Sequence, residues 1–421
     1  MKIDYARRFS SFSDQALYQS LDERLRLYVR EMGFRYQLTF QELRQMTEIS
    51  VDLHMWDEEP IHVPGRPSKE EMLQTVKDRW LALREEETRY PSKPSARPFS
   101  PESKKKTLAV NQGNNGVFGM CPVASEKTVC CNLHTIDTVQ GCGFGCSYCS
   151  IQTFYDPGSI AVDNNLSEKL ANISLNPERN YHICSGQSSD SLLLGNQNGI
   201  LDAQFEFARM NPNVLLELKT KSKNVRYLIE ADVPPNVFVS WSLNPQLIID
   251  NEEHRTASQE QRLDAARRVA DRGIRVAFHF HPMIYYRGWK EDYSRLIQNV
   301  LSLFSPEEVV MVSFGTLTFI KSAIKNLRLT GLPSKVLQIP MEETAGKYSY
   351  SIGTKEEMFR TAWDEFRPWQ DRVFFYLCME SRELWESVFG FCYDSNEEFE
   401  QAMLQDLAHK LRINGQPHTL S

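Results

Sequence analysis

The feature that most constrains the fold is an alternation of β-rich runs with helix-like stretches, which begins near residue 133. The runs are rich in β-branched and aromatic residues, and the stretches between them repeat apolar residues at helical spacing. Strands that alternate with helices form a parallel sheet of right-handed βα units, and such folds bind ligands at the carboxyl ends of the strands. Six runs show the pattern: HTIDTV (134–139), NYHICS (180–185), NVLLELK (213–219), NVFVSWSL (236–243), IRVAFHF (274–280) and EEVVMVSFG (307–315).

The cysteines are the most informative part of the composition. The chain has 421 residues and nine cysteines, of which six lie between residues 121 and 149. No apolar run approaches the ~18 residues of a membrane helix, and the N-terminus lacks the apolar core of a signal peptide, so we expect a cytoplasmic protein with no membrane partner. Thiols stay reduced in the cytoplasm, and the cluster therefore indicates metal or redox chemistry rather than a disulfide framework.

Changes in composition divide the chain into four predicted parts. Residues 1–95 form a helical N-terminal region, because apolar residues recur at helical spacing among charged ones. Residues 96–132 are a linker rich in Pro, Ser and Lys, followed by a cysteine-containing segment. Residues 133–330 carry the βα pattern. Residues 331–421 form an acidic α/β extension, with nine Lys and Arg against fifteen Asp and Glu, that could cover the site as a lid.

Charge alone does not identify a partner. The formal net charge is −7, and residues 331–421 account for −6 of it, since nine basic residues face fifteen acidic ones. A nucleic-acid partner requires only a local basic groove. One candidate groove comprises Lys219, Lys221, Lys223 and Arg226, although a solvated strand end explains the same residues.

The strongest motif is the cysteine spacing in QGCGFGCSYC, directly after the first β-rich run. Cys142, Cys146 and Cys149 form Cys-x3-Cys-x2-Cys. A [4Fe–4S] cluster normally has four thiolate ligands, so three leave one iron open to a small molecule. The glycines at alternate positions let the loop wrap tightly around a bulky inorganic core. A zinc knuckle, with His134 as a fourth ligand, and an electron-carrying cluster remain alternatives.

This spacing and its position are typical of the radical S-adenosylmethionine (SAM) superfamily, and the chain beyond it resembles the spore photoproduct lyase family. The resemblance runs from about residue 118 to about 360. It is carried by CPVASEKTVCCNL, CSYC, SSDS, TKSKNV, SWSLNP, RLDAARRVADRGIRVAFHFHPM, YYRGW and VSFGTLTF, in the family's order. The resemblance implies an α/β fold, a partial (β/α)6 TIM-like barrel of the radical SAM type, between a helical N-terminal region and a C-terminal α/β extension.

The resemblance also implies a set of site residues. The three motif cysteines would hold a [4Fe–4S] cluster, and Tyr148 stands where the family has a tyrosine inside the motif. His281 alternates with His279 on a predicted strand, so both point to one face, and His281 meets the cofactor if that face is the barrel interior. The residues that stand where the family contacts SAM, or beside those positions, are Ser189, Asp190, Lys221, Ser242 and Asn244.

Two departures from the family concern how its reaction ends. The family returns a hydrogen atom to its product from a cysteine just before the serine–aspartate stretch, and Gln187 stands there. Cys184, three residues earlier, is therefore the candidate donor, with a buried strand cysteine as the alternative. Ser150 replaces a tyrosine that follows the last motif cysteine. The other upstream cysteines, Cys121 and the pair 130–131, are interpreted as structural, with a second metal site or redox thiols as the alternatives.

The predicted function is that of a radical SAM enzyme, lyase-like, that generates a 5′-deoxyadenosyl radical to abstract hydrogen from its substrate. The leading substrate is DNA that carries a thymine-dimer lesion, which is easier to take out of the stack than an intact step. A flavodoxin- or ferredoxin-like protein would supply the electron. The alternatives are an enzyme of the same family that acts on RNA, a peptide or a small metabolite, and a non-catalytic iron–sulfur or zinc protein.

Overall fold

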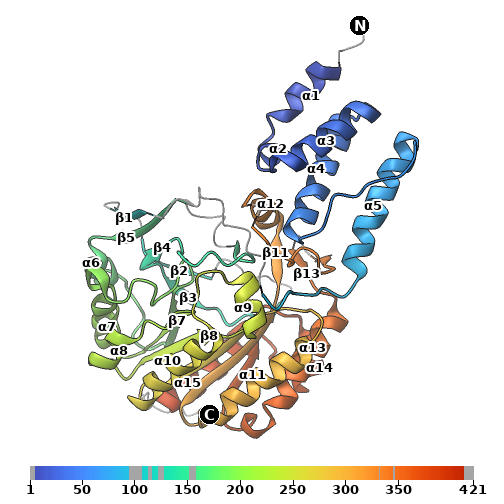
Figure 1. The fold of residues 1–421 in the computed structure, drawn as a ribbon. Helices are drawn as coiled ribbons and strands as arrows, with labels where there is room; N and C mark the ends of the chain where they lie inside the picture. The colour runs from blue at the N-terminus through green and yellow to red at the C-terminus, as the bar shows by residue number, and fades with distance from the viewer. Residues whose placement is uncertain are drawn as a thin grey trace.

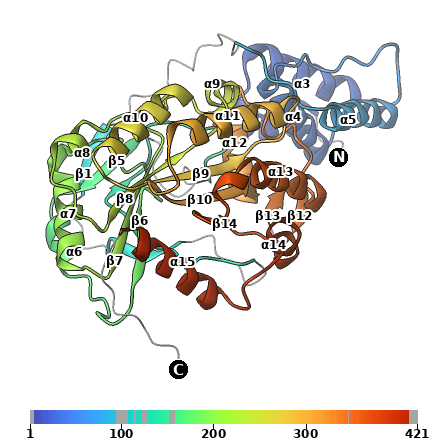
Figure 2. The same ribbon diagram turned by 90° about the horizontal axis from the view of Figure 1, so that it is seen from below.

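A curved eight-stranded sheet forms the core of the chain (Figures 1 and 2). The computed structural model describes residues 5–93, 107–111, 116–121, 128–150, 158–330, 332–344 and 347–411. The strand order is β14-β10-β9-β8-β7-β6-β3-β2, and only β2 runs antiparallel to its neighbour. The strands are β2 (Phe118–Met120), β3 (His134–Ile136), β6 (Tyr181–Ser185), β7 (Val214–Thr220), β8 (Val237–Ser242), β9 (Val276–Met283), β10 (Val309–Thr316) and β14 (Phe374–Leu377).

The six β-rich runs of the sequence are confirmed as neighbouring parallel strands, β3 and β6 to β10. All residues of β8 and β10 are buried, as expected for apolar strands covered on both faces. The first run differs in detail, because it splits into β3 and a separate strand, β4 (Val139–Gln140). β4 pairs with β5 (Ser159–Asp163), which in turn pairs with β1 (Thr107–Asn111) in a second sheet. The split turns the chain away from the core sheet just before the motif cysteines.

Helices cover the outer face of the core sheet (Figures 1 and 2). A capping box at Ser258 and Gln261 starts α10, and its apolar face packs against β8 and β9. The helices of this region are α6 (Leu166–Ala171), η2 (Gln197–Gly199), α7 (Ile200–Met210), α8 (Arg226–Glu230), α9 (Gln246–Glu252), α10 (Gln259–Asp271), α11 (Trp289–Leu303), α13 (Ile352–Glu365), η3 (Arg367–Trp369) and α14 (Arg382–Phe389). The partial βα barrel predicted from the sequence is therefore the observed fold.

The last described helix, α15 (Asn396–Leu411), lies at the amino ends of the barrel strands. Its Glu400 pairs with Arg179, just before β6, at 2.7 Å. Its Lys410 donates to the Val309 carbonyl, at the start of β10, at 2.6 Å. These contacts place α15 opposite the carboxyl ends, where the ligands of such folds bind, so this part of the acidic extension does not serve as the expected lid.

The helical N-terminal region extends away from the barrel (Figure 1). Its helices are α1 (Tyr5–Ser13), α2 (Ala16–Gln19), α3 (Glu23–Tyr36), α4 (Phe40–Met55) and α5 (Lys69–Glu85). Capping boxes start α4 at Thr39 and α5 at Ser68. These five helices confirm the helical character that periodicity predicted for this region. The domain boundaries at 95, 132 and 330 stay a prediction.

The helix α12 joins the N-terminal region to the barrel. It runs Lys321–Thr330, after β11 (Thr318–Ile320). β11 pairs with β13 (Lys347–Ser349), which pairs on its other side with β12 (Glu342–Thr344). Arg328 of α12 forms a bidentate pair with Asp52 of α4, with Nε–Oδ1 at 2.7 Å and a second contact at 2.8 Å. Asp52 is buried, so this charge-assisted fork fixes α4 on α12.

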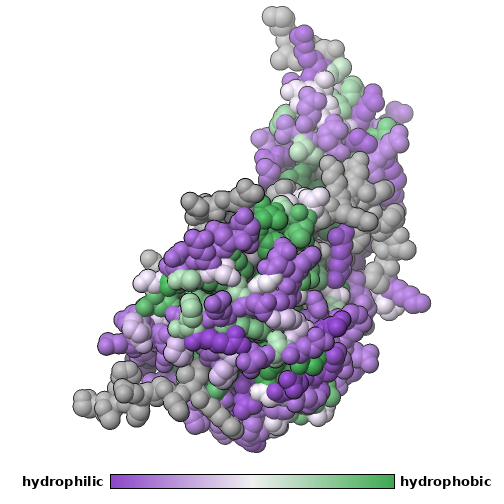
Figure 3. Space-filling model, turned by 90° about the vertical axis from the view of Figure 1, so that its left-hand side faces the viewer, coloured by the Kyte–Doolittle hydropathy of each residue, from purple (hydrophilic) through white to green (hydrophobic). Residues whose placement is uncertain are grey.

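The surface is mainly hydrophilic. On the face drawn in Figure 3, hydrophilic residues dominate, and hydrophobic ones show through in patches below the N-terminal helices. Among the described residues, no helix combines the length and the apolar character that a membrane crossing requires.

Candidate active site

The three motif cysteines lie on one loop that follows β4. Gly141 and Gly145 adopt positive φ values of 80° and 71°, and a Cβ on Gly141 would come within 2.8 Å of the Ser159 carbonyl oxygen. Glycine is therefore required at position 141 for the loop to turn. Burial raises the pKa of Cys146 well above its usual range, and the nearby Cys149 and Cys142 thiols raise it further. The loop thus gathers three sulfur atoms at one place.

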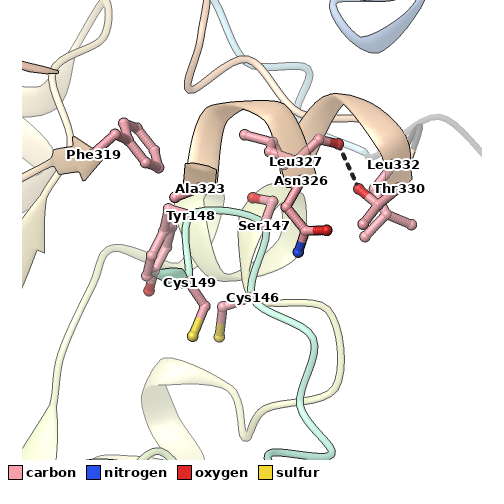
Figure 4. Close-up of a pocket in the computed structure, with 10 residues that line it drawn as sticks. All are labelled: Cys146, Ser147, Tyr148, Cys149, Phe319, Ala323, Asn326, Leu327, Thr330 and Leu332. Atoms are coloured by element: carbon pink, nitrogen blue, oxygen red, sulfur yellow. Dashed lines mark hydrogen bonds between the residues drawn. The ribbon is translucent and has the colours of Figure 1, made fainter. Parts of the chain in front are cut away.

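The sulfur atoms of Cys146 and Cys149 point to the same side of the loop, away from α12 (Figure 4). On the other side, Ser147 and Phe319 contribute to a small cavity against α12. Among the described residues, no three His, Cys, Asp or Glu side chains could hold a single metal ion. Three neighbouring thiols on a glycine-rich loop do fit a group with several iron atoms, in which each thiolate binds a different iron.

A second loop, after β6, is bound to the cysteine loop. The Gly141 N–H donates to the Ser188 carbonyl at 3.2 Å, and Ser188 Oγ donates to the Val139 carbonyl at 2.9 Å. Ser189 Oγ donates to the Gly141 carbonyl at 2.8 Å. The predicted residue Ser189 therefore lies directly beside the motif cysteines, with its oxygen lone pairs still available to a ligand.

Asp190 links the same loop to the end of β7. Its carboxylate accepts from Thr220 Oγ1 at 2.8 Å, from the Lys221 N–H at 2.6 Å and from the Leu192 N–H at 3.0 Å. Burial raises the pKa of Asp190, although these hydrogen bonds oppose the increase. The structure thus gives Asp190 a positioning role, in which it holds the strand-end loops together.

A buried ionic network brings together three of the residues expected at the cofactor site. Lys221 Nζ lies 2.9 Å from both Tyr148 OH and Glu253 Oε1. Asn244 Nδ2 donates to the same Glu253 oxygen at 2.8 Å, and Tyr148 OH donates to it as well. Tyr148, Lys221 and Asn244 come from three separate loops, so their meeting at one carboxylate positions the cysteine loop against the ends of β7 and β8.

Glu253 is the centre of this network, and the sequence did not single it out. It is fully buried and ion-paired with the equally buried Arg262 of α10. Burial raises the pKa of Glu253, but the charges of Arg262 and Lys221 outweigh burial and hold it below its usual range. Burial and the Glu253 charge raise the pKa of Tyr148, so its phenol keeps its proton. In the sequence, DNEEHR resembles the exposed acidic end of a helix, and only the contact partners reveal its role.

Replacing Glu253 with alanine is expected to destabilise the protein by about 3–5 kcal/mol, because Arg262 would remain buried without its partner. Equilibrium denaturant unfolding measures the change. A matched control is Glu357→Ala, since Glu357 pairs with Lys290 on the surface, where ion pairs contribute at most about 1 kcal/mol. An equal, small effect for both variants would contradict the importance assigned to Glu253.

Polar residues fill the interior of the barrel. Glu217 on β7 lies 2.8 Å from His182 Nε2 and 2.6 Å from His279 Nε2, and His279 Nδ1 lies 2.5 Å from Ser313 Oγ. Burial and the nearby Lys219 lower the pKa of His279 to about 4. His279 and His281 were expected on the same side of β9, and the contacts of His279 show that this side faces the barrel interior.

His281 lies nearer the carboxyl end of β9 than His279. Its ring would collide with a side chain at Gly315, where a Cβ would come within 2.6 Å of it. Burial and the charge of Lys219 hold the pKa of His281 well below its usual range, so the ring is neutral. Ser242 ends β8 and is buried, and its carbonyl accepts from Arg262 at 2.8 Å. Both predicted cofactor residues thus lie at the strand ends.

Two thiols border this interior near the serine–aspartate loop. Cys184 shares a face of β6 with His182, is fully buried, and donates from its thiol to the Ser185 carbonyl at 3.1 Å. Burial and the Glu217 charge raise the pKa of Cys184 well above its usual range. Cys121, directly after β2, is half-buried, and Gln187 Nε2 donates to its Sγ at 3.5 Å. The sequence did not link Cys121 to Gln187, because 66 residues separate them.

The neighbouring pair Cys130 and Cys131 differs from these two thiols. Both are buried, and the Cys130 N–H donates to Asn396 Oδ1 at 2.9 Å. A hydrogen bond from Cys131 lowers the pKa of Cys130 to about 6. The backbone contact of Cys130 ties this segment to α15.

The curved parallel sheet, the three-cysteine loop at its carboxyl edge and the serine–aspartate loop beside it define a partial barrel of the radical SAM type. The family model of spore photoproduct lyase matches residues 124–361. The chain therefore belongs to the spore photoproduct lyase family, whose members are radical SAM lyases.

Individual relatives agree with this assignment. The chain is 24% identical over 268 residues to the spore photoproduct lyase of Clostridium acetobutylicum, which covers 62% of this chain and 76% of that protein. A structure of spore photoproduct lyase complexed with dinucleoside spore photoproduct is similar with a TM-score of 0.56 and 22% identity, over 67% of this chain and 87% of that one. A variant with bound AdoMet and dinucleoside spore photoproduct gives a TM-score of 0.55 and 19% identity, over 73% and 94%. At these identities the two structures support the fold.

Proposed function

We propose that this protein is a radical SAM lyase that repairs a thymine-dimer lesion in DNA. The observation that carries the proposal is the loop of Cys142, Cys146 and Cys149, which the serine–aspartate loop joins to the barrel mouth. The relatives that bind AdoMet and dinucleoside spore photoproduct support the choice of cofactor and substrate. A cytoplasmic flavodoxin- or ferredoxin-like protein is the proposed source of the electron.

The residues of the mouth have separate tasks in this proposal. The motif cysteines would hold a [4Fe–4S] cluster, and SAM would lie among the strand ends. Together, when bound, these groups supply a 5′-deoxyadenosyl radical that takes a hydrogen atom from the substrate. The residues proposed to hold SAM there are Ser189, Lys221, Ser242, Asn244 and His281, with Asp190 fixing the loops that carry them.

The chain's own contribution is orientation and control of protons. Glu253 holds Lys221 and Tyr148 in place without exposure to water. The neutral His281 ring adds a polar contact without a charge at the mouth. A thiol that keeps its hydrogen can return it to a carbon radical. The two candidates beside the serine–aspartate loop are Cys184, whose pKa burial raises, and the less buried Cys121.

One observation favours a second candidate function. Gln187 stands where the family has its hydrogen-donor cysteine, and an amide has no weakly bound hydrogen to give. The second candidate is an enzyme of the same family that acts on RNA, a peptide or a small metabolite. If its product radical is quenched without a thiol, it does not need a cysteine at this position.

Anaerobic reconstitution tests the proposal directly. We expect about four irons per chain and, after reduction, 5′-deoxyadenosine from SAM. An oligonucleotide that carries a methylene-bridged thymine dimer should then be converted into one with two unlinked thymines. Zinc in place of iron, or a cluster that never cleaves SAM, would contradict the enzyme assignment. SAM cleavage without repaired thymine would exclude DNA repair and favour the second candidate.

A further inference from the structure

A cavity of about 670 Å³ lies between the N-terminal helices and α12, a size typical of ligand pockets. Its α12 residues include Lys321, Lys325 and Arg328. A different face of α12, with Ala323 and Leu327, packs against the cysteine loop (Figure 4). The helix thus has the cavity on one side and the candidate active site on another. The N-terminal wall of the cavity lies outside the part of the chain that matches the family.

The lining is strongly basic in a protein whose net charge is −7. It contains five cationic side chains and one carboxylate, that of Glu48. Three of the cations have acidic partners, namely Arg328 with Asp52, Arg44 with Glu48 and Lys321 with Glu343. The remaining two are Lys325 and Arg84.

Among the described residues, neither of these two cations forms an ion pair or a hydrogen bond with a carboxylate, although the charge of Asp52 acts on Arg84. Lys325 is exposed, without a hydrogen bond or ion pair to any described residue. The Arg84 guanidinium lies 5.0 Å from the centre of the Trp80 ring, and its buried Nε has no hydrogen-bond partner among the described residues. A buried donor without a partner is costly, so an anion in the cavity would satisfy it.

Aromatic rings accompany the cations. Trp80, Phe40 and Tyr348 line the cavity, and Phe40 is 38% exposed. Cations beside accessible aromatic faces are the combination that binds single-stranded nucleic acid, because phosphates meet the charges and unstacked bases stack on the rings. An acidic peptide would use the charges but not the ring faces.

We propose that this cavity binds a single-stranded segment of DNA, with a phosphate at Lys325 and Arg84 and a base against the aromatic residues. The choice of DNA rests on the proposed function. A strand held on one face of α12 would lie next to the site that the other face supports. The cavity would therefore hold DNA that flanks the lesion, and its contacts would not depend on the lesion itself.

Fluorescence anisotropy with an undamaged fluorescein-labelled 12-mer tests the proposal on the full chain. Lys325→Glu should weaken binding about tenfold and reduce the slope of log K against log salt by about 1, whereas Lys325→Arg should retain binding. The matched control is Arg268→Glu, an equal charge change on an exposed residue of α10, which should stay within twofold of the unaltered protein. Thermal unfolding confirms that each variant folds.

The result that overturns the proposal is equal binding by Lys325→Glu and the unaltered protein, or an equal loss with Arg268→Glu. Competition by polyglutamate as strong as that by DNA would also overturn it, in favour of an acidic peptide. Binding is measured without reductant and without a lesion, so its outcome is independent of catalysis. Loss of binding in Lys325→Glu, together with no cleavage of the thymine dimer by the unaltered protein, would support the cavity and contradict the repair function.

Discussion

The Cys146→Ala variant is expected to bind far less iron than the unaltered protein and to lose reductive SAM cleavage. Three thiolates leave no spare ligand on the loop, so removal of one leaves a second iron unheld. Cys146 is the most buried of the three motif cysteines, and no other described side chain completes a metal-binding group there. The measurements are iron per chain after anaerobic reconstitution, the visible absorbance of the cluster, and 5′-deoxyadenosine released under dithionite.

Cys392→Ala is the matched control for this variant. Cys392 is partly buried, and it lies between α14 and α15, far along the chain from the motif. It should keep the full iron content and SAM cleavage. A full cluster in Cys146→Ala, or an equal loss in Cys392→Ala, would show that the motif is not the ligand set.

The barrel could be predicted because its signal is local and repeated. Each of the runs that form β6 to β10 is a short, nearly continuous apolar segment. Such a segment is typical of a strand in a parallel sheet that is covered on both faces. The cysteine motif was equally readable, because three thiols at fixed spacing on a glycine-rich loop have few other uses. A split strand is harder to predict from sequence. The run at 134–139 divides because β3 pairs with β6, whereas β4 pairs with β5 of the second sheet.

The parts that the sequence did not reveal depend on contacts between distant residues. Glu253 matters because Arg262, Lys221 and Asn244 converge on it, and none of these pairings has a local pattern. The position of α15 at the amino ends follows from pairs such as Arg179 with Glu400. Such contacts form only after the chain has folded and brought distant residues together. No spacing of residues along the sequence indicates them.

The last step of the proposed reaction needs a hydrogen donor, and the thiols of the chain are the candidates. In the proposed function, a substrate radical must receive a hydrogen atom, and a thiol is a suitable donor. Cys130 does not suit the task, because it is buried and its N–H is bonded to Asn396 of α15, opposite the carboxyl ends of the strands. Cys184 keeps its proton but is fully buried, with its thiol directed to the Ser185 carbonyl. Cys121 is half-buried and lies beside Gln187, which occupies the family's donor position.

We therefore expect Cys121→Ala to reduce repair of the thymine dimer at least about tenfold while SAM cleavage continues, because the product radical would lack its nearest accessible donor. Thiol hydrogens exchange with solvent, so the unaltered enzyme in D2O should place deuterium in the product, and the variant should not. Cys184→Ala should keep both product and label, since a fully buried thiol does not meet the substrate. The reverse result, with loss only in Cys184→Ala, would return the donor role to Cys184, as the sequence predicts. Retention of labelled product in both variants would exclude both thiols and favour the candidate function that needs no thiol at this position.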